Sequence, residues 1–188
     1  MRQDSINAQI HSILRVLGIL CFLVYLTDTF SQTLGDIQKR CRSQIRTVHS
    51  FNTFDTHPKN QDFSDCSPDT LCSKAAEALK QSDWNTVDEY TKKCIQLYQD
   101  QARSQQGTLS SYPDIINARN YTYLNNVAFC HYLRGEMFIA IKQTKKAIAE
   151  YRIPIKEYGF AIGYDPDDNI YWRIAGKCKS IIIQLQSK

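Results

Sequence analysis

The sequence contains none of the short motifs that mark the common classes of enzyme. No glycine-rich phosphate loop, GxSxG turn or HExxH sequence occurs in its 188 residues. No two cysteines stand in a CxxC spacing, which argues against a zinc site or a thioredoxin-like motif. Cys130 and His131 are neighbours, but adjacent side chains on a helix diverge by about 100° and are poorly placed to work as a catalytic pair. We therefore expect a protein without catalytic residues, metal ligands or a cofactor.

Strong charge of one sign is also missing. The chain carries 23 Lys and Arg against 19 Asp and Glu, a formal net charge of +4, and the two signs are interspersed. A nucleic-acid-binding surface needs a compact basic stripe, so we expect no nucleic-acid partner. Glycine and proline are few, with 7 and 5 residues, and most of them stand between periodic apolar segments. This arrangement favours helices joined by short loops.

The longest unbroken apolar run lies near the N-terminus, at residues 16–26. It is shorter than the roughly 20 residues needed to cross a bilayer, and small residues follow it at positions that a signal peptidase reads. We expect residues 1–31 to be a signal peptide and the protein to be exported to a periplasmic or extracellular space. Two alternatives remain open: residues 13–26 anchor the protein in a membrane, or the run is a buried helix of a soluble protein. A membrane is a partner only if this segment is retained.

The cysteine count fits export. Loss of the leader removes Cys21 and leaves six cysteines, an even number that permits disulfides but allows fifteen connectivities. Cys66 and Cys72 flank the start of a predicted helix and could pair locally. Cys94 and Cys130 fall on helix faces that we expect to be buried, which favours free thiols in the core.

After the leader, we expect residues 32–66 to form a helix and a linker, and residues 67–188 to form a helical domain. Ser67 and Pro68 have the residue types of a helix cap and first helical position. The predicted helix runs to a turn at residues 81–83, and a second helix starts at Trp84.

The most regular stretch of the domain is residues 121–154. Apolar residues recur there at steps of three and four on two segments, which indicates two amphipathic helices. We predict the turn between them at residues 134–136. Beyond them, a turn-rich passage with Tyr158, Phe160 and Tyr164 is expected to fold back over the hairpin ends. A last helix is expected from Asn169 to about Leu185, capped by Asp168 or Asn169 and closing the bundle.

The two predicted helical hairpins can be aligned on each other. Ser82-Asp83-Trp84 then matches Gly135-Glu136-Met137, and small residues recur at Ala128, Ala140 and Ala147. This pattern resembles the tetratricopeptide repeat (TPR), with a spacing of 53 residues (135 minus 82) instead of the usual length of about 34.

Further features resemble a group of small exported bacterial TPR proteins, for which no activity is known that could be transferred. These features are Leu124-Asn125-Asn126-Val127, Tyr164-Asp165-Pro166 and Tyr171-Trp172. The resemblance implies an all-α fold of stacked antiparallel helix hairpins with long helices and a C-terminal capping helix.

Repeats of this kind bind protein or peptide partners in a groove lined by the first helix of each pair. The resemblance places five residues in such a groove: Leu79, Lys80, Asn125, Phe129 and Tyr132. The alternative is that the last helix fills the groove and these residues are core.

We therefore predict a non-catalytic interaction or scaffold module. Two alternatives remain. One is an enzyme of unrecognised class, which would gather His, Asp and Glu side chains from distant parts of the chain. The other is a membrane-tethered assembly factor that retains its leader.

Overall fold

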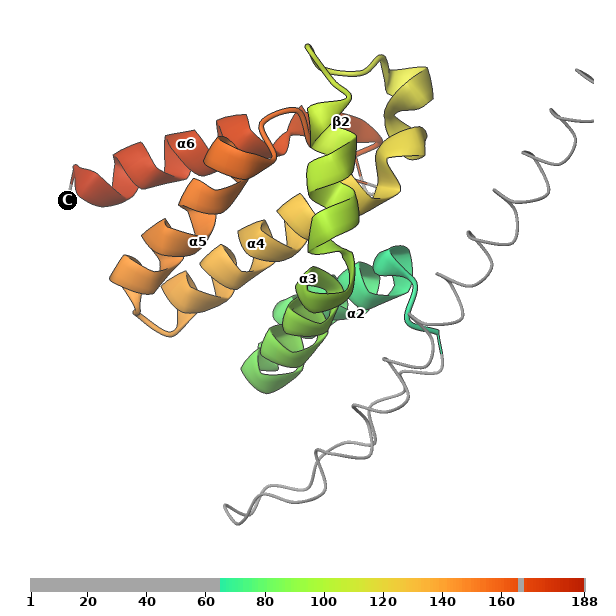
Figure 1. Ribbon diagram of the computed structural model, residues 1–188. Coiled ribbons are helices and arrows are strands. Elements are labelled where there is room, and N and C mark those ends of the chain that lie inside the picture. The colour runs from blue at the N-terminus through green and yellow to red at the C-terminus, as the bar shows by residue number, and fades with distance from the viewer. Residues whose placement is uncertain (1–64, 166–167, 188) are drawn as a thin grey trace, which may run out of the picture. The chain divides into compact units, whose positions relative to one another are not determined.

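The computed structural model describes residues 65–165 and 168–187 (Figure 1). This part of the chain is mostly helical, with five α-helices and one small antiparallel sheet of two strands. Its elements in chain order are α2 (Pro68–Lys80), α3 (Trp84–Gly107), the 3₁₀ helix η2 (Ile115–Tyr121), α4 (Thr122–Ala140), α5 (Thr144–Glu157), β1 (Ile162–Asp165), β2 (Ile170–Arg173) and α6 (Ile174–Gln186).

The predicted leader at residues 1–31 and almost all of the linker lie outside the described residues. Within the described ranges, no helix combines the length and the apolar character that a membrane span requires.

The start of the domain follows the sequence prediction. Ser67 is the N-cap of α2, and its hydroxyl oxygen accepts a hydrogen bond from the Thr70 backbone N–H at 3.2 Å. Pro68 occupies the first helical position, where no N–H donor is needed. Asp69 lies in the first turn, close to the positive end of the helix dipole. Residues 81–83 form the turn before α3, as predicted.

Helix α4 is the centre of the described domain. It packs against α2, α3 and α5, and Figure 1 shows it between α3 and α5. Helix α6 packs mainly against α5. A helix with neighbours on several sides needs apolar residues around most of its circumference. The sequence of α4 supplies them, and its buried residues are Leu124, Val127, Ala128, Cys130, His131, Leu133, Gly135 and Met137.

The predicted turn at residues 134–136 is wrong. Helix α4 continues through this segment to Ala140, and the turn lies at residues 141–143. Gly135 is needed for close packing, because a Cβ atom there would lie 2.3 Å from Cε1 of Tyr151 on α5. The left-handed residue of the turn is Lys142, with φ of 61°.

The two helical turns share one geometry, and this changes the repeat alignment. Ser82 has φ of 58°, and the Asp83 N–H donates to the Ala78 carbonyl. Lys142 has φ of 61°, and the Gln143 N–H donates to the Phe138 carbonyl. Ser82 therefore corresponds to Lys142, an offset of 60 residues (142 minus 82), and not to Gly135.

The last helix starts later than predicted. Residues 162–165 and 170–173 form the β1–β2 hairpin, in which Gly163 pairs with Trp172. Helix α6 begins at Ile174 with Arg173 as its N-cap, so neither Asp168 nor Asn169 caps it. Asn169, with φ of 54°, lies in the hairpin turn. The indole of Trp172 lies against Gly163, where a Cβ atom would come within 2.5 Å of it.

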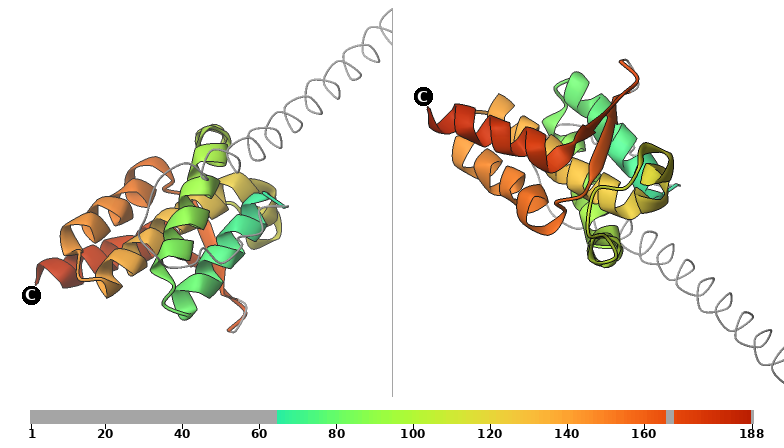
Figure 2. Two further views of the ribbon diagram at one scale, coloured as in Figure 1. Left: turned by 90° about the horizontal axis from the view of Figure 1, so that it is seen from below. Right: turned by 90° about the horizontal axis from the view of Figure 1, so that it is seen from above.

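The apolar stripe of α6 faces the domain as expected. Ile174 and Cys178 are buried, and Ile181, Ile182 and Leu185 are half-buried. Figure 2 shows α6 alongside α5 at the C-terminal end of the stack. In the preceding passage Tyr158 is buried and Phe160 half-buried, whereas Tyr164 is exposed and does not cover the hairpin ends.

Candidate functional site

The five residues predicted to line a groove lie in two places. Leu79 packs at the end of α2 against a small core cluster that contains Val87 and Met137, with Trp84 and Phe138 at its edge. Lys80, the last residue of α2, is exposed. The other three residues are on α4.

Asn125 holds two segments against α4. Its Nδ2 donates a hydrogen bond to the Ala118 carbonyl of η2 at 2.9 Å, and its Oδ1 accepts one from the Ile162 N–H of β1 at 2.9 Å. Both groups of the amide are therefore used to attach neighbouring backbone. Asn125 positions the β-hairpin at the base of β1.

Phe129 and Tyr132 form an aromatic cluster with Trp172 of β2. The Phe129 and Tyr132 rings stack at 5.7 Å, and Trp172 meets them edge-on at 5.9 and 5.2 Å. Burial, with a contribution from Glu136, raises the pKa of Tyr132 well above its ordinary value. Trp172 thus occupies part of the surface that the groove hypothesis assigned to a partner.

The outer end of the β-hairpin is exposed. Tyr164 on β1 is 46% exposed and Ile170 on β2 is 55% exposed. Tyr164 contacts Tyr171 across the strands, and its hydroxyl donates to Oδ1 of Asn169 at 3.0 Å. Figure 2 shows this end of the hairpin extending beyond the neighbouring helices. The hairpin therefore has an anchored part around Trp172 and a displayed part around Ile170.

A charged network crosses α4 on its other side. Arg134 donates from Nη1 to Asp88 of α3 and from Nε to Glu150 of α5, both at 2.7 Å. The second oxygen of Glu150 lies 2.8 Å from Nδ1 of His131. The side chains of His131, Arg134 and Glu150 are 9%, 11% and 15% exposed, so the network is largely removed from water.

Hydrogen bonds set the ionisation of the two carboxylates. Burial alone would raise the pKa of Glu150, but hydrogen bonds from His131 and Arg134 outweigh it, and the pKa is lowered. Asp88 follows the same pattern, with Lys92 and Arg134 as its donors. The network thus holds two anions among cations and links α3, α4 and α5.

The network meets one requirement of the enzyme alternative, because it gathers His131, Asp88 and Glu150 from distant parts of the chain. However, both oxygens of Glu150 are already bonded within the protein. These bonds hold the carboxylate against His131 and Arg134, and the Glu150 side chain is only 15% exposed. This arrangement favours a structural role for Glu150.

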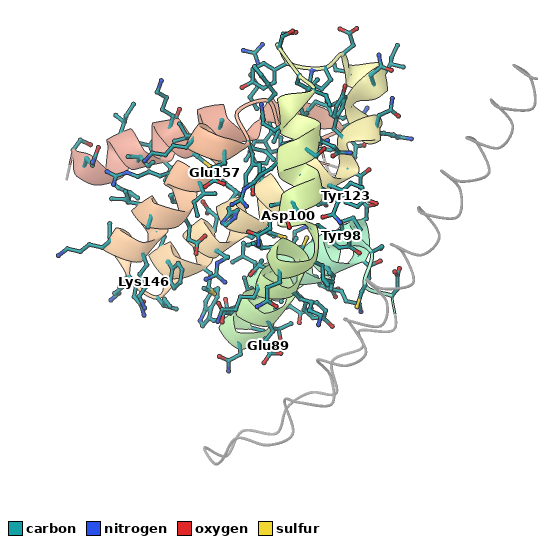
Figure 3. All side chains as sticks on the ribbon, in the orientation of Figure 1. Glu89, Tyr98, Asp100, Tyr123, Lys146 and Glu157 are labelled. Carbon is teal, nitrogen blue, oxygen red and sulfur yellow. The ribbon has the colours of Figure 1, made fainter. Side chains whose placement is uncertain are left out.

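A second bridge between α3 and α5 lies nearer the surface. Arg103 contacts Glu157 at 3.0 Å and Asp100 at 3.6 Å. Figure 3 shows Asp100 on α3 and Glu157 on α5 on the same side of the domain. These side chains are at least 41% exposed, so solvent screens this bridge.

Three buried thiols meet where α2, α3 and α4 pack together. Cys72 on α2, Cys94 on α3 and Cys130 on α4 are free and at most 1% exposed. This confirms the prediction of free core thiols at Cys94 and Cys130. The suggested local pair of Cys66 with Cys72 is wrong, since Cys72 is a free thiol. In the described part of the chain, no group of three or more His, Cys, Asp or Glu residues is arranged to hold a metal ion.

Sequence analysis missed Asp88, Arg134 and Glu150 as members of one site. The pairs are 46 and 16 residues apart in the chain, so no local spacing signals them. One feature of the sequence could have indicated the network: the charged residues Arg134 and Glu150 interrupt otherwise apolar helix faces. That signal becomes specific only once the turn is placed at residues 141–143.

Comparison with protein-family models, with curated proteins and with solved structures finds no significant match. The function is therefore argued from the geometry of the chain itself.

Proposed function

We propose that residues 67–188 form a TPR-like module that binds a protein partner, and that the displayed end of the β1–β2 hairpin is its main contact. The observation that carries this proposal is the division of the hairpin into an anchored and a displayed part. Trp172 is packed against Phe129 and Tyr132, whereas Ile170, two residues earlier on the same strand, is 55% exposed.

The packing order of the helices supports a TPR-like arrangement. α2 packs on α3, α4 on α5, and α4 also packs on α2, while α6 follows on α5. Stacked hairpins of this kind bury a continuous core and leave surfaces for partners. Here the charged network and the buried thiols lie between the packed helices, so surface side chains can bind a partner without any rearrangement of the core.

The composition of the displayed end suits protein recognition. Tyrosine is enriched among the residues that dominate the binding energy of protein interfaces, and apolar residues fill the buried centre of such interfaces. Tyr164 and Ile170 are both exposed on a hairpin whose base is held by Asn125. A fixed base reduces the entropy that binding would cost.

A random peptide library displayed on phage tests this function. We expect the wild-type protein to enrich a set of related peptides. Ile170→Asp should weaken their binding by at least about tenfold, or about 1.4 kcal/mol. The matched control is Ile183→Asp on α6, since Ile183 is 62% exposed on a different element. This control should leave the affinity unchanged.

Two results would contradict the proposal. One is the absence of any enriched sequence family with a protein whose circular dichroism shows it to be folded. The other is peptide binding that Ile183→Asp weakens as much as Ile170→Asp does. We also propose that the protein is exported, and the intact mass of protein expressed with its native leader tests this separately.

A further inference from the structure

The buried thiols of α2 and α4 are placed to react with each other. The Sγ atoms of Cys72 and Cys130 lie 3.7 Å apart, although the residues are separated by 58 positions in the chain. A disulfide requires an S–S distance of about 2.05 Å, so the two sulfur atoms must approach by a further 1.6 Å or so.

We propose that Cys72 and Cys130 are an oxidation site and form a disulfide that links α2 to α4 when the protein meets a small-molecule disulfide oxidant. The oxidant class is glutathione disulfide. One cysteine thiolate attacks it, releases one glutathione and forms a mixed disulfide. The second cysteine thiolate displaces the second glutathione. Two protein thiols lose two protons and two electrons, and one glutathione disulfide becomes two glutathione molecules.

Cys130 has two thiol neighbours, and the 3.7 Å contact of its Sγ atom with that of Cys72 favours Cys72 as its partner. The Cys130 thiol interacts with both Cys72 and Cys94, so a disulfide with either of them has to be considered. Cys72 belongs to α2, which packs mainly on α3 and α4 among the described helices. Cys94 belongs to α3, which also packs on α4. The link from Cys72 joins α2 to α4, the centre of the described domain.

Burial controls when the reaction occurs. Burial, together with the neighbouring thiols, raises the pKa of Cys130. The hydrogen bond from Cys130 lowers the pKa of Cys72, but burial, Cys94 and Asp69 raise it by more. Both side chains are at most 1% exposed and thiolate is the reactive form, so both residues are slow to react while α2 is in place. The disulfide therefore forms during folding, or when α2 separates from α4.

The experiment uses the full chain, reduced, unfolded and refolded with or without a glutathione redox buffer. Refolding with the buffer is expected to lower the intact mass by about 2 Da for each disulfide formed. Proteolytic mapping is expected to identify a peptide pair joined through Cys72 and Cys130. The urea midpoint of the oxidised protein should be higher than that of the reduced protein, because the link closes a long loop.

Controls separate this pair from other cysteines. Cys178→Ser should leave the Cys72–Cys130 peptide pair intact, because Cys178 is buried elsewhere, on α6. Cys94→Ser should also leave it intact, whereas Cys72→Ser should abolish it. The proposal is overturned if Cys72 and Cys130 are both fully alkylated after oxidative refolding. It is also overturned if the mapped link is Cys94–Cys130. Both readouts come from the wild-type chain, so they do not depend on the folding of any variant.

Discussion

The turn between α2 and α3 and the turn between α4 and α5 have the same backbone geometry but different surroundings. Ser82 and Lys142 occupy the left-handed position, and neither is glycine. After the first turn, Asp83 caps α3 by accepting from the Thr86 N–H at 3.2 Å. After the second, Gln143 caps α5 without a side-chain hydrogen bond. The second hairpin therefore lacks the side-chain cap that the first hairpin has.

Those contacts differ in kind from the contacts of the first hairpin. Helix α2 packs with Leu71, Ala75 and its thiol Cys72, all nearly inaccessible to solvent. Helices α4 and α5 are joined by the close approach of Tyr151 to Gly135 and by the charged bridge from Arg134 to Glu150. The comparison teaches that one turn geometry can join two pairs of helices whose packing differs, with apolar residues and a thiol in the first pair and a glycine contact and a charged bridge in the second.

The largest effect is expected from removing the cation of the second hairpin. Arg134→Met leaves Asp88 and Glu150 without their shared partner, which should lower the free energy of unfolding by about 2–4 kcal/mol, given that Asp88 is partly solvated. Urea denaturation measures the change. The matched control is Arg103→Met, which breaks the exposed bridge to Glu157 and should cost at most about 1 kcal/mol. Equal losses in both variants would show that the buried network stabilises the protein no more than an exposed salt bridge does.

The same variant should change the pH dependence of stability. The folded pKa values of Asp88 and Glu150 are lowered from their ordinary 3.8 and 4.5, so the unfolded chain binds more protons in acid. Their contribution is fully present above pH 4.5 and is lost as pH falls through the folded pKa values. Arg134→Met removes one cause of the lowered values, so its stability should fall less steeply below that pH than that of the wild type. A steeper fall in the variant would contradict this account.

A smaller loss is expected when the close approach in the second hairpin is blocked. Gly135→Ala places a methyl group into the ring of Tyr151, whose hydroxyl is also held by Glu136 at 2.6 Å. The resulting strain should cost about 2 kcal/mol despite the better helix propensity of alanine. Thermal and urea unfolding would report it. Gly107→Ala, at a position with no atom within 4 Å of the added Cβ, should be neutral or stabilising by about 0.5 kcal/mol.

The smallest effects should be the same in both turns. Ser82→Gly and Lys142→Gly each relieve a left-handed non-glycine residue, so each should stabilise the protein by about 1 kcal/mol or less. Arg152→Gly, at an exposed position inside α5, should instead destabilise it by about 1 kcal/mol. If Lys142→Gly lost as much stability as Arg152→Gly, residue 142 would behave as a helical residue. The two turns would then not be equivalent.

The sequence predicted the helical character, the first hairpin and the burial of Cys94 and Cys130. Each of these depends on information within a few residues: a Ser-Pro start, a polar turn, and apolar residues at steps of three and four. It misplaced the second turn because Gly135 followed by Glu136 resembles a turn, while Ile141-Lys142-Gln143 contains no turn-forming residue. It also missed the strands, since two segments of four residues give too short a pattern.

Local sequence alone determined that this chain forms amphipathic helices with a capped start at Ser67, because capping and periodicity act over one or two turns. Only the tertiary structure explains Gly135 and Gly163, because each of them packs closely against an aromatic ring of another element. It likewise decided the network around Arg134 and the thiol contact of Cys72 with Cys130. These contacts join residues at least 9 positions apart (172 minus 163). They stabilise the protein only after its elements have packed together, so no local pattern in the sequence predicts them.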